Sequence, residues 1–466
     1  MKTCVLPFML CLASITLRGQ DITGEWNGVL KVQGIQLRLV FHISKSGNGY
    51  SATMDSPDQN AKGIPVSEVN YKHPVLKLSV SGAGIEYEGS SDADGNITGT
   101  FKQMGQSLPL NLTRKKIEKE ELHRPQEPVK PYPYIEEDVS FENREAGVRL
   151  AGTLTLPRKT GQFPAVVLIS GSGAQNRDEE LMGHRPFLII ADYLTRNGIA
   201  VLRFDDRGTA ASSGDFQKAN TADFSNDVEA AVKYLLTRKE INKRQIGLIG
   251  HSEGGIIAPM VAARRSKDIA FIVLLAGTGI QGKELLLLQS EAISRASGIS
   301  EELLQASMSL SRSIYDLALQ TTDKDELQTA VSARIRELIA VYPAMIPADM
   351  SEDTFIRLQI RALTSPWLQY FLKYNPAVDL EKVKCPVLAL NGEKDLQVPA
   401  KINLEAIRTA LLKGGNKAVT VMELPGLNHL FQECETGLPA EYGTIEQTFS
   451  PTALREIMKW ITALNF

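Results

Sequence analysis

Residues 245–263 read QIGLIGHSEGGIIAPMVAA, and this stretch decides the fold. Gln245–Ile249 is an apolar run of strand length, and Gly255–Ala263 is apolar over the length of a helix. The residues GHSEG, from Gly250 to Gly254, lie between them. A strand, a sharp turn and a helix in this order project a serine hydroxyl above the edge of a sheet. The flanking glycines are needed because the turn is too tight for side chains. The sequence therefore predicts that Ser252 is a nucleophile.

The chain around this stretch alternates strands with helices. Continuous apolar runs are typical of strands buried on both faces, and they recur at Ala165–Ile169, Ile199–Phe204, Ile246–Ile249, Ile269–Ala276, Val387–Leu390 and Val419–Met422. Helical stretches such as Asp223–Thr237 lie between them. This alternation predicts an α/β fold with a mostly parallel sheet and helices on both faces, formed by residues 135–281 and 379–466.

Residues 282–378 interrupt the alternation because they contain no convincing strand. Apolar residues at helical spacing share one face in two stretches, Leu303–Leu317 and Leu327–Leu338. A helical insertion of this size between two core strands predicts a lid over the site. The alternative is a helical layer that does not contact substrate, because amphipathic helices are also general packing elements.

A serine hydroxyl needs a base to remove its proton, and the histidines leave one candidate. The chain has six histidines, and only His429 lies downstream of Ser252, just after the predicted strand Val419–Met422. His251 neighbours the serine and should point elsewhere if the turn forms as predicted. We therefore predict that His429 is the general base.

The base in turn needs a carboxylate that fixes its tautomer. The residues NGEKD, from Asn391 to Asp395, follow the predicted strand Val387–Leu390, so their carboxylates lie at the carboxyl end of a strand. The chain order Ser, Asp, His is the order of α/β-hydrolases. Asp395 is the predicted acid, and Glu393 is the alternative because the sequence does not define the geometry of this turn.

The negative charge that develops on the substrate oxygen needs two backbone donors. One is expected to be the N–H of Glu253, the residue after the nucleophile. The other is expected in the loop after Ala165–Ile169, where the sequence SGSG begins at Ser170. Its small residues let the backbone approach a substrate, so we predict the N–H of Ser172, with Gly173 as the second choice. The alternative is a glycine turn without a catalytic role.

Four motifs together resemble those of bacterial α/β-hydrolase carboxylesterases. They are GHSEGG at 250–255, SGSG at 170–173 with Arg177-Asp178 beyond it, FDDRG at 204–208 and NGEKD at 391–395. The resemblance covers residues 135–466 apart from the lid, and it implies an α/β-hydrolase fold and ester hydrolysis without a cofactor. Ser170 stands where many relatives carry histidine, which leaves the second oxyanion donor open.

The first 134 residues predict three segments of other kinds. Residues 1–19 combine Lys2 with a short apolar run, as an export signal does, and this predicts a periplasmic or secreted protein. Residues 21–114 alternate short strands with turn clusters and predict a small all-β, barrel-like domain. Its Gly24-Glu25-Trp26 resembles the entry strand of lipocalin-like barrels. Residues 115–134 are charged and then proline-rich, and they predict an extended linker.

Composition and spacing argue against several classes of ligand. The chain of 466 residues has a formal net charge of -3, so nothing indicates a nucleic-acid partner. No apolar run is long enough to span a membrane, and no ligand spacing indicates a metal. The sequence GTGIQG at 277–282 matches a dinucleotide-binding pattern, but helices follow it instead of a second strand. Cys385 and Cys434 are expected to be two thiols or one bridge.

The resulting hypothesis is an exported serine carboxylesterase that acts on a small-molecule ester, most simply a short- to medium-chain acyl ester such as an acetyl ester. A serine peptidase of the same fold is the first alternative, because both reactions use the same triad. The second is a non-catalytic binding protein that uses its β-domain. The oligomeric state, the role of the β-domain and the acyl and alcohol specificity are not encoded in any motif.

Overall fold

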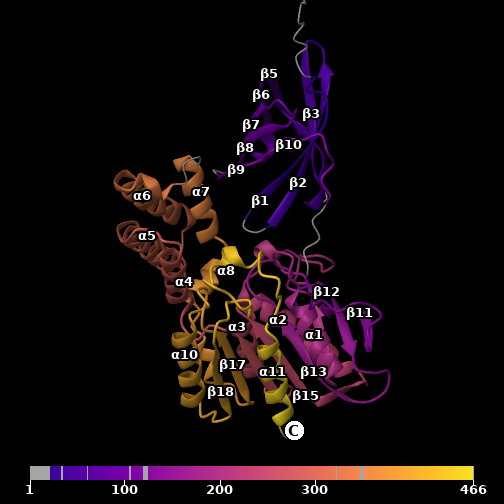
Figure 1. Cartoon of the computed structure of the whole chain (residues 1–466). Helices are drawn as coiled ribbons and strands as arrows, with labels where there is room; N and C mark the ends of the chain where they lie inside the picture. The colour runs from indigo at the N-terminus through magenta and orange to yellow at the C-terminus, as the bar shows by residue number, and fades with distance from the viewer. Residues whose placement is uncertain are drawn as a thin grey trace, which may run out of the picture. The chain divides into compact units, whose positions relative to one another are not determined.

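The computed structural model describes residues 21–32, 35–59, 61–103, 106–118, 124–321, 323–346 and 351–464. The predicted export signal at 1–19 lies outside these ranges. The described residues fall into two compact units, which we treat separately: an N-terminal unit of strands and a C-terminal unit of strands and helices (Figure 1).

The N-terminal unit is a 10-stranded antiparallel sheet. Nine strands follow the order β4-β3-β2-β1-β10-β8-β7-β6-β5, and the ninth strand in the chain, β9, pairs with β8. Their bounds are β1 (Gly24–Val32), β2 (Ile35–Ser46), β3 (Gly49–Ser56), β4 (Ala61–Val66), β5 (Glu68–Lys72), β6 (Val75–Val80), β7 (Ile85–Ser91), β8 (Ile97–Gln103), β9 (Gln106–Pro109) and β10 (Leu112–Thr113).

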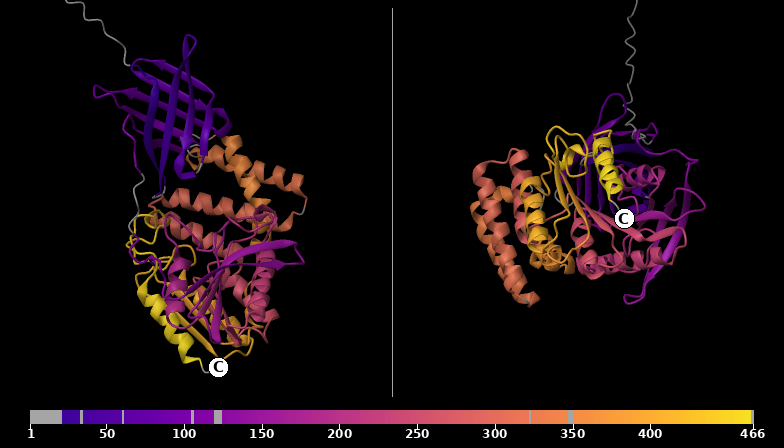
Figure 2. Two further views of the ribbon diagram at one scale, coloured as in Figure 1. Left: turned by 90° about the vertical axis from the view of Figure 1, so that its right-hand side faces the viewer. Right: turned by 90° about the horizontal axis from the view of Figure 1, so that it is seen from below.

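This sheet curls around its own core, as Figure 2 shows. Trp26, Phe41, Tyr87 and Phe101 are among the buried side chains inside it. Strands β3 and β5 approach each other, so the sheet is nearly closed. Closure removes unpaired strand edges, which otherwise invite pairing with other chains. The predicted all-β, barrel-like domain is confirmed.

The C-terminal unit is built on an 8-stranded sheet of order β11-β12-β14-β13-β15-β16-β17-β18. The first three strands in this order pair antiparallel, and the others pair parallel. Their bounds are β11 (Ile135–Asn143), β12 (Val148–Leu156), β13 (Phe163–Ile169), β14 (Ala200–Phe204), β15 (Ile241–His251), β16 (Phe271–Leu275), β17 (Val387–Gly392) and β18 (Val419–Leu424).

Helices cover both faces of this sheet. Helices α1 (Pro186–Arg196) and α11 (Pro451–Ala463) bury apolar side chains in one core, and α2 (Thr221–Thr237), α3 (Gly254–Arg264) and α10 (Ala400–Lys413) do so in the other. The central strands are buried along their whole length because both of their faces are covered. The predicted α/β-hydrolase fold, with its mostly parallel sheet, is confirmed.

The helical insertion lies between β16 and β17 and forms a separate layer (Figure 1). Its main helices have their own apolar core, to which Leu310, Val331 and Ile356 contribute. Their bounds are α4 (Gly282–Ala296), α5 (Glu301–Gln320), α6 (Lys324–Val341), α7 (Glu352–Leu363) and α8 (Pro366–Lys373). Serine or aspartate N-caps begin α5, α6, α7 and α8, so local sequence sets where these helices start.

Residues 124–127 belong to the C-terminal unit and form hydrogen bonds within it. The Arg124 guanidinium donates to backbone carbonyl oxygens, including those of Ile445 at 2.8 Å and Gly443 at 3.1 Å. The Gln126 side chain donates to the Phe449 carbonyl oxygen at 2.7 Å. Proline density indicated an extended segment, but it carried no information about what the polar side chains between the prolines would contact.

We expect Arg124→Met to destabilise the C-terminal unit by about 2–4 kcal/mol, because several carbonyls lose a charged donor that methionine does not replace. Lys130→Met is the matched control, since the Lys130 ammonium is exposed and its ion pair with Glu136 is worth little. The free energy of unfolding in urea, followed by intrinsic fluorescence, measures both. Equal midpoints for the two variants would show that Arg124 does not anchor the segment.

Two further findings concern the described chain as a whole. No helix within the described ranges is long and apolar enough to cross a membrane. Cys385 and Cys434 are free thiols, so the alternative of a bridge between them is excluded here. Burial raises the pKa of both thiols, which keeps them protonated and weakly reactive.

Candidate active site

The predicted nucleophile lies on a strained turn between β15 and α3. Ser252 has a φ of 53°, in the left-handed region that side chains other than glycine seldom occupy. A Cβ atom at Gly250 would lie 1.9 Å from the Gly254 carbonyl oxygen, and one at Gly254 would lie 2.1 Å from that of Ile169. Glycine is therefore the residue that fits on either side of this serine, as the sequence predicts.

The predicted base and acid are in contact. His429 Nδ1 lies 2.8 Å from Asp395 Oδ2, and both side chains are buried. Asp395 Oδ1 accepts the backbone N–H groups of Gln397 and Val398, each at 2.8 Å. Because a carboxylate only accepts, Nδ1 of His429 carries the proton and Nε2 is left with its lone pair. The alternative acid, Glu393, is exposed and accepts the N–H of Gly426 at 3.0 Å instead.

Ser252 and His429 line one pocket, with a volume of about 210 Å³. Glu253 and Ser172, two of the predicted oxyanion donors, line it too, whereas Gly173 does not. Within the described chain, the backbone N–H groups of Glu253 and Ser172 have no hydrogen-bond partner, so both are available to a ligand. The N–H of Gly171, by contrast, donates to Glu179 Oε1 at 2.6 Å.

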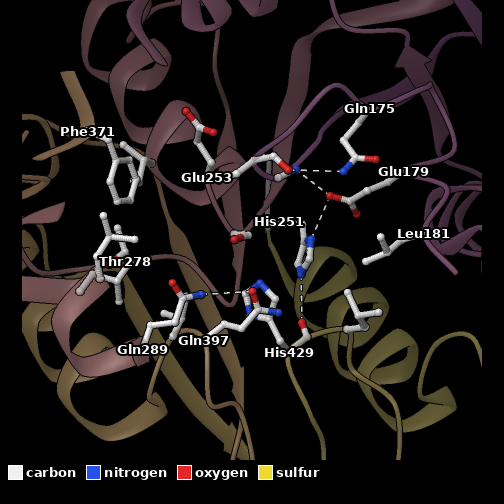
Figure 3. Close-up of a pocket in the computed structure, with 18 of the residues that line it drawn as sticks. Gln175, Glu179, Leu181, His251, Glu253, Thr278, Gln289, Phe371, Gln397 and His429 are labelled. Atoms are coloured by element: carbon white, nitrogen blue, oxygen red, sulfur yellow. Dashed lines mark hydrogen bonds and ion pairs between the residues drawn. The ribbon is translucent and has the colours of Figure 1, made fainter. Parts of the chain in front are cut away.

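The lid supplies one wall of this pocket. Leu285, Leu286 and Gln289 come from α4, and Trp367 and Phe371 come from α8. Figure 3 shows Phe371, Thr278 and Gln289 grouped on the side of the pocket away from Glu179 and Leu181. Helices α4 and α8 of the predicted lid therefore line the pocket that holds Ser252 and His429, and contact between these helices and a substrate stays a prediction. The apolar stretch around Trp367 packs partly in the core and partly at this wall.

A polar contact joins the lid to the loop that carries the predicted acid. The Gln289 side chain donates to Gln397 Oε1 at 3.2 Å, and Gln397 donates to the Tyr442 hydroxyl at 3.1 Å. Since the backbone N–H of Gln397 also binds Asp395, this residue connects α4 to the acid (Figure 3).

The carboxylate of Asp206 holds the loop that carries the predicted oxyanion donor, and sequence reasoning missed this role. Asp206 accepts the Ser170 hydroxyl at 2.8 Å and the Gln175 N–H at 2.9 Å. Burial raises the pKa of Asp206 to about 8. The FDDRG motif offered a signal, because two adjacent acidic residues at the end of a buried strand need partners.

The side chain of Glu253 connects the nucleophile turn to the lid. Glu253 Oε1 accepts the Trp367 indole N–H at 2.9 Å and the Thr221 hydroxyl at 2.6 Å. Burial raises the pKa of this carboxyl. The residue after the nucleophile thus offers its backbone to the pocket while its side chain holds α8.

The glycines of the sequence GTGIQG at 277–282 are explained by packing. A Cβ at Gly279 would lie 2.5 Å from the Asn403 carbonyl oxygen, and one at Gly282 would lie 1.9 Å from that of Phe371. The Gly279 N–H donates to the Asn403 side chain at 3.0 Å. The loop therefore needs glycine for close approach to α10 and α8.

The fold and this arrangement of side chains define a serine hydrolase of the α/β-hydrolase class. Residues 146–408 match the family model described as X-Pro dipeptidyl-peptidase (S15 family). Because this match spans more than half of the chain, the protein belongs to that family. The matched segment includes Ser252 and Asp395 and ends before His429.

Two individual proteins are similar to this chain in sequence. Esterase EstD of Thermotoga maritima is 25% identical over 330 residues, which cover 69% of this chain and 68% of the relative. Protein PA2218 of Pseudomonas aeruginosa is 32% identical over 115 residues, which cover 24% of this chain and 29% of the relative. The match to EstD confirms the resemblance to bacterial esterases, and the chain is an enzyme of the serine-hydrolase class.

Two solved structures align with this chain at low similarity. The esterase Pf2001 of Pyrococcus furiosus aligns with a TM-score of 0.41 at 16% identity, covering 71% of this chain and 90% of that one. The crystal structure of PA2218 aligns with a TM-score of 0.42 at 16% identity, covering 75% of this chain and 99% of that one.

Proposed function

We propose that the protein hydrolyses carboxylic esters with small acyl groups through an acyl-enzyme on Ser252. The observation that carries the proposal is the His429–Asp395 pair at 2.8 Å, with Ser252 on the wall of the same pocket. A histidine whose Nδ1–H is held by a carboxylate presents a basic Nε2, which is what activation of a serine requires.

In this reaction His429 Nε2 takes the proton of Ser252 Oγ as the oxygen attacks the ester carbonyl. The N–H groups of Glu253 and Ser172 donate to the oxyanion that forms. His429 then gives its proton to the leaving alcohol, and the acyl group stays on Ser252. A water molecule, deprotonated by the same histidine, releases the acid and regenerates the enzyme.

The pocket supports a small acyl group. Its volume of about 210 Å³ lies below the range of pockets that enclose drug-sized ligands. Ile256, Leu285 and Phe371 give it apolar surface on the lid side. An acetyl or butyryl group would fit such a wall, and we expect a long acyl chain to fit it less well.

The hydrogen bonds that the nearby carboxylates already accept favour an ester substrate over a peptide. An exopeptidase needs a carboxylate that is free to bind the substrate ammonium group. Glu179 already accepts the Gly171 N–H and faces His251, and Glu253 already accepts from Trp367 and Thr221. An ammonium group that bound Oε1 of either residue would compete with these contacts, and breaking a buried hydrogen bond costs about 1–3 kcal/mol.

A peptidase that removes X-Pro dipeptides is the second candidate. The matched family model carries that description, and the same triad can cleave amides.

We further propose that the protein acts outside the cytoplasm, in the periplasm or after secretion, on the basis of residues 1–19.

Matched nitrophenyl esters and nitroanilides test the proposal, with Ser252→Ala as the background. We expect kcat/KM for nitrophenyl acetate and butyrate to exceed that for the matched anilides and for a Gly-Pro anilide by about 100-fold or more. The octanoate should fall at least about tenfold below the butyrate, because the longer chain fits the pocket wall less well. Anilide values equal to the ester values would favour the peptidase instead.

A further inference from the structure

His251 is held at both ring nitrogens by groups that accept hydrogen bonds. Its Nδ1 lies 2.9 Å from Glu179 Oε1, and its Nε2 lies 2.9 Å from the carbonyl oxygen of His429 (Figure 3). A neutral imidazole has one N–H and satisfies one of these acceptors, whereas an imidazolium satisfies both. The geometry therefore favours a charged His251 paired with an ionised Glu179.

The pair touches each part of the proposed machinery. Glu179 Oε1 accepts the N–H of Gly171, the residue before the predicted oxyanion donor Ser172. His251 directly precedes Ser252 in the chain. Its contact with the His429 carbonyl fixes the backbone that carries the predicted base. One ion pair thus connects three segments that are far apart in the sequence.

Desolvation and backbone strain both oppose the formation of this pair in the folded protein. Glu179 is 5% exposed and His251 is 7% exposed, so both charges are removed from water. Glu179 has a φ of 51°, a left-handed conformation that strains the backbone of a residue other than glycine. A Cβ at Gly171 would lie 3.3 Å from Glu179 Oε1 and 3.2 Å from the Ser252 Cβ, so the loop closes tightly on both.

Other titratable groups face this pair from the surrounding elements. The Asp206 carboxyl interacts electrostatically with Glu179, and Asp395 does so with His251. The His429 ring centroid lies 4.9 Å from that of His251. Burial by itself lowers the pKa of His251, but the Glu179 carboxylate and the two hydrogen bonds outweigh this and raise it.

We propose that the Glu179–His251 ion pair is a positioning device, which holds the Ser172 N–H and the His429 ring in register with the Ser252 hydroxyl. The inference rests on the proposed function, because it assigns the pair to the transition state of that reaction. Neither residue needs to touch substrate in this role. Loss of the pair should therefore lower kcat and leave KM nearly unchanged.

Glu179→Gln tests this, with Glu180→Gln as the matched control. Glutamine keeps an oxygen for the Gly171 N–H but loses the charge, while Glu180 is an exposed neighbour that accepts from the Asn176 side chain. We expect Glu179→Gln to lower kcat for nitrophenyl acetate about 10- to 100-fold, less than the ~10²–10³-fold cost of deleting an oxyanion donor. KM should change by less than about threefold, and Glu180→Gln should stay within about twofold of wild type in both constants.

A second measurement determines the protonation state of His251 in the wild-type protein itself. Nitrogen-15 NMR of histidine-labelled wild-type protein, with the His251 signals assigned by their loss in His251→Gln, reports whether both ring nitrogens carry protons. We expect the imidazolium form at neutral pH. A neutral His251 in the folded wild type would overturn the proposal, whatever the variants do.

The outcomes separate this inference from the proposed function. A wild-type protein that neither hydrolyses esters nor reacts with a fluorophosphonate at Ser252 would overturn both. An active wild type whose folded Glu179→Gln variant keeps its kcat, or loses activity through KM alone, would overturn the positioning role and leave the proposed function standing.

Discussion

Ser252→Ala is expected to lower kcat for nitrophenyl acetate by about 10⁵- to 10⁶-fold, because no other group can form the acyl-enzyme. His429→Ala should lose nearly as much, since nucleophile and base act as a unit and neither works alone. The Ser252 turn is already strained at a φ of 53°, which alanine tolerates as well as serine, so the variant should fold normally.

Pre-steady-state kinetics and a fluorophosphonate probe measure this result. Wild type should show a burst of nitrophenol, and mass spectrometry should place the probe on Ser252. Ser290→Ala is a suitable control, because Ser290 lies on α4 but does not line the pocket. Turnover by Ser252→Ala within about tenfold of wild type would require a different nucleophile.

Asp395→Asn is expected to lower kcat by about 10³- to 10⁴-fold with a smaller effect on KM. Asp395 Oδ1 accepts two backbone N–H groups, so the asparagine oxygen will occupy that position and its NH₂ group will face His429. His429 can meet that NH₂ group only with an unprotonated Nδ1. Its proton then moves to Nε2, where it blocks removal of the Ser252 proton.

Glu393→Gln provides the matched comparison, because the sequence offers Glu393 as the alternative to Asp395 for the acid that orients His429. Glutamine can still accept the Gly426 N–H, so we expect kcat within about threefold of wild type. Measuring kcat for the two variants in parallel across pH 5–9 shows which of the two carboxylates acts as the acid. A large loss in Glu393→Gln together with a small loss in Asp395→Asn would reverse it.

The sequence by itself determined the fold class and two of the three proposed catalytic residues. The nucleophile turn is a local feature, encoded by glycines where no side chain fits and by the apolar strand and helix on either side. His429 followed by elimination, because it is the histidine downstream of Ser252. The parallel core was readable because strands buried on both faces are continuously apolar.

Short strands with mixed composition are hard to locate from the sequence. Strands β4 and β5, AKGIPV and EVNYK, lie within residues 61–72. Their side chains are mostly exposed or half-buried, so the apolar alternation is weak. They form because β3 and β6 pair with them, and pairing partners are not visible in a local pattern.

Only the tertiary structure decided which polar groups meet. It brought Asp395 rather than Glu393 to His429, and Ser172 rather than Gly173 to the pocket. It also joined Glu179 to His251, residues that lie 72 positions apart. Apolar periodicity reports how much of a side chain is buried, which is a property of its own segment. A buried carboxylate or histidine is defined instead by its hydrogen-bond partner, and that partner comes from whichever distant loop the fold brings within about 3 Å.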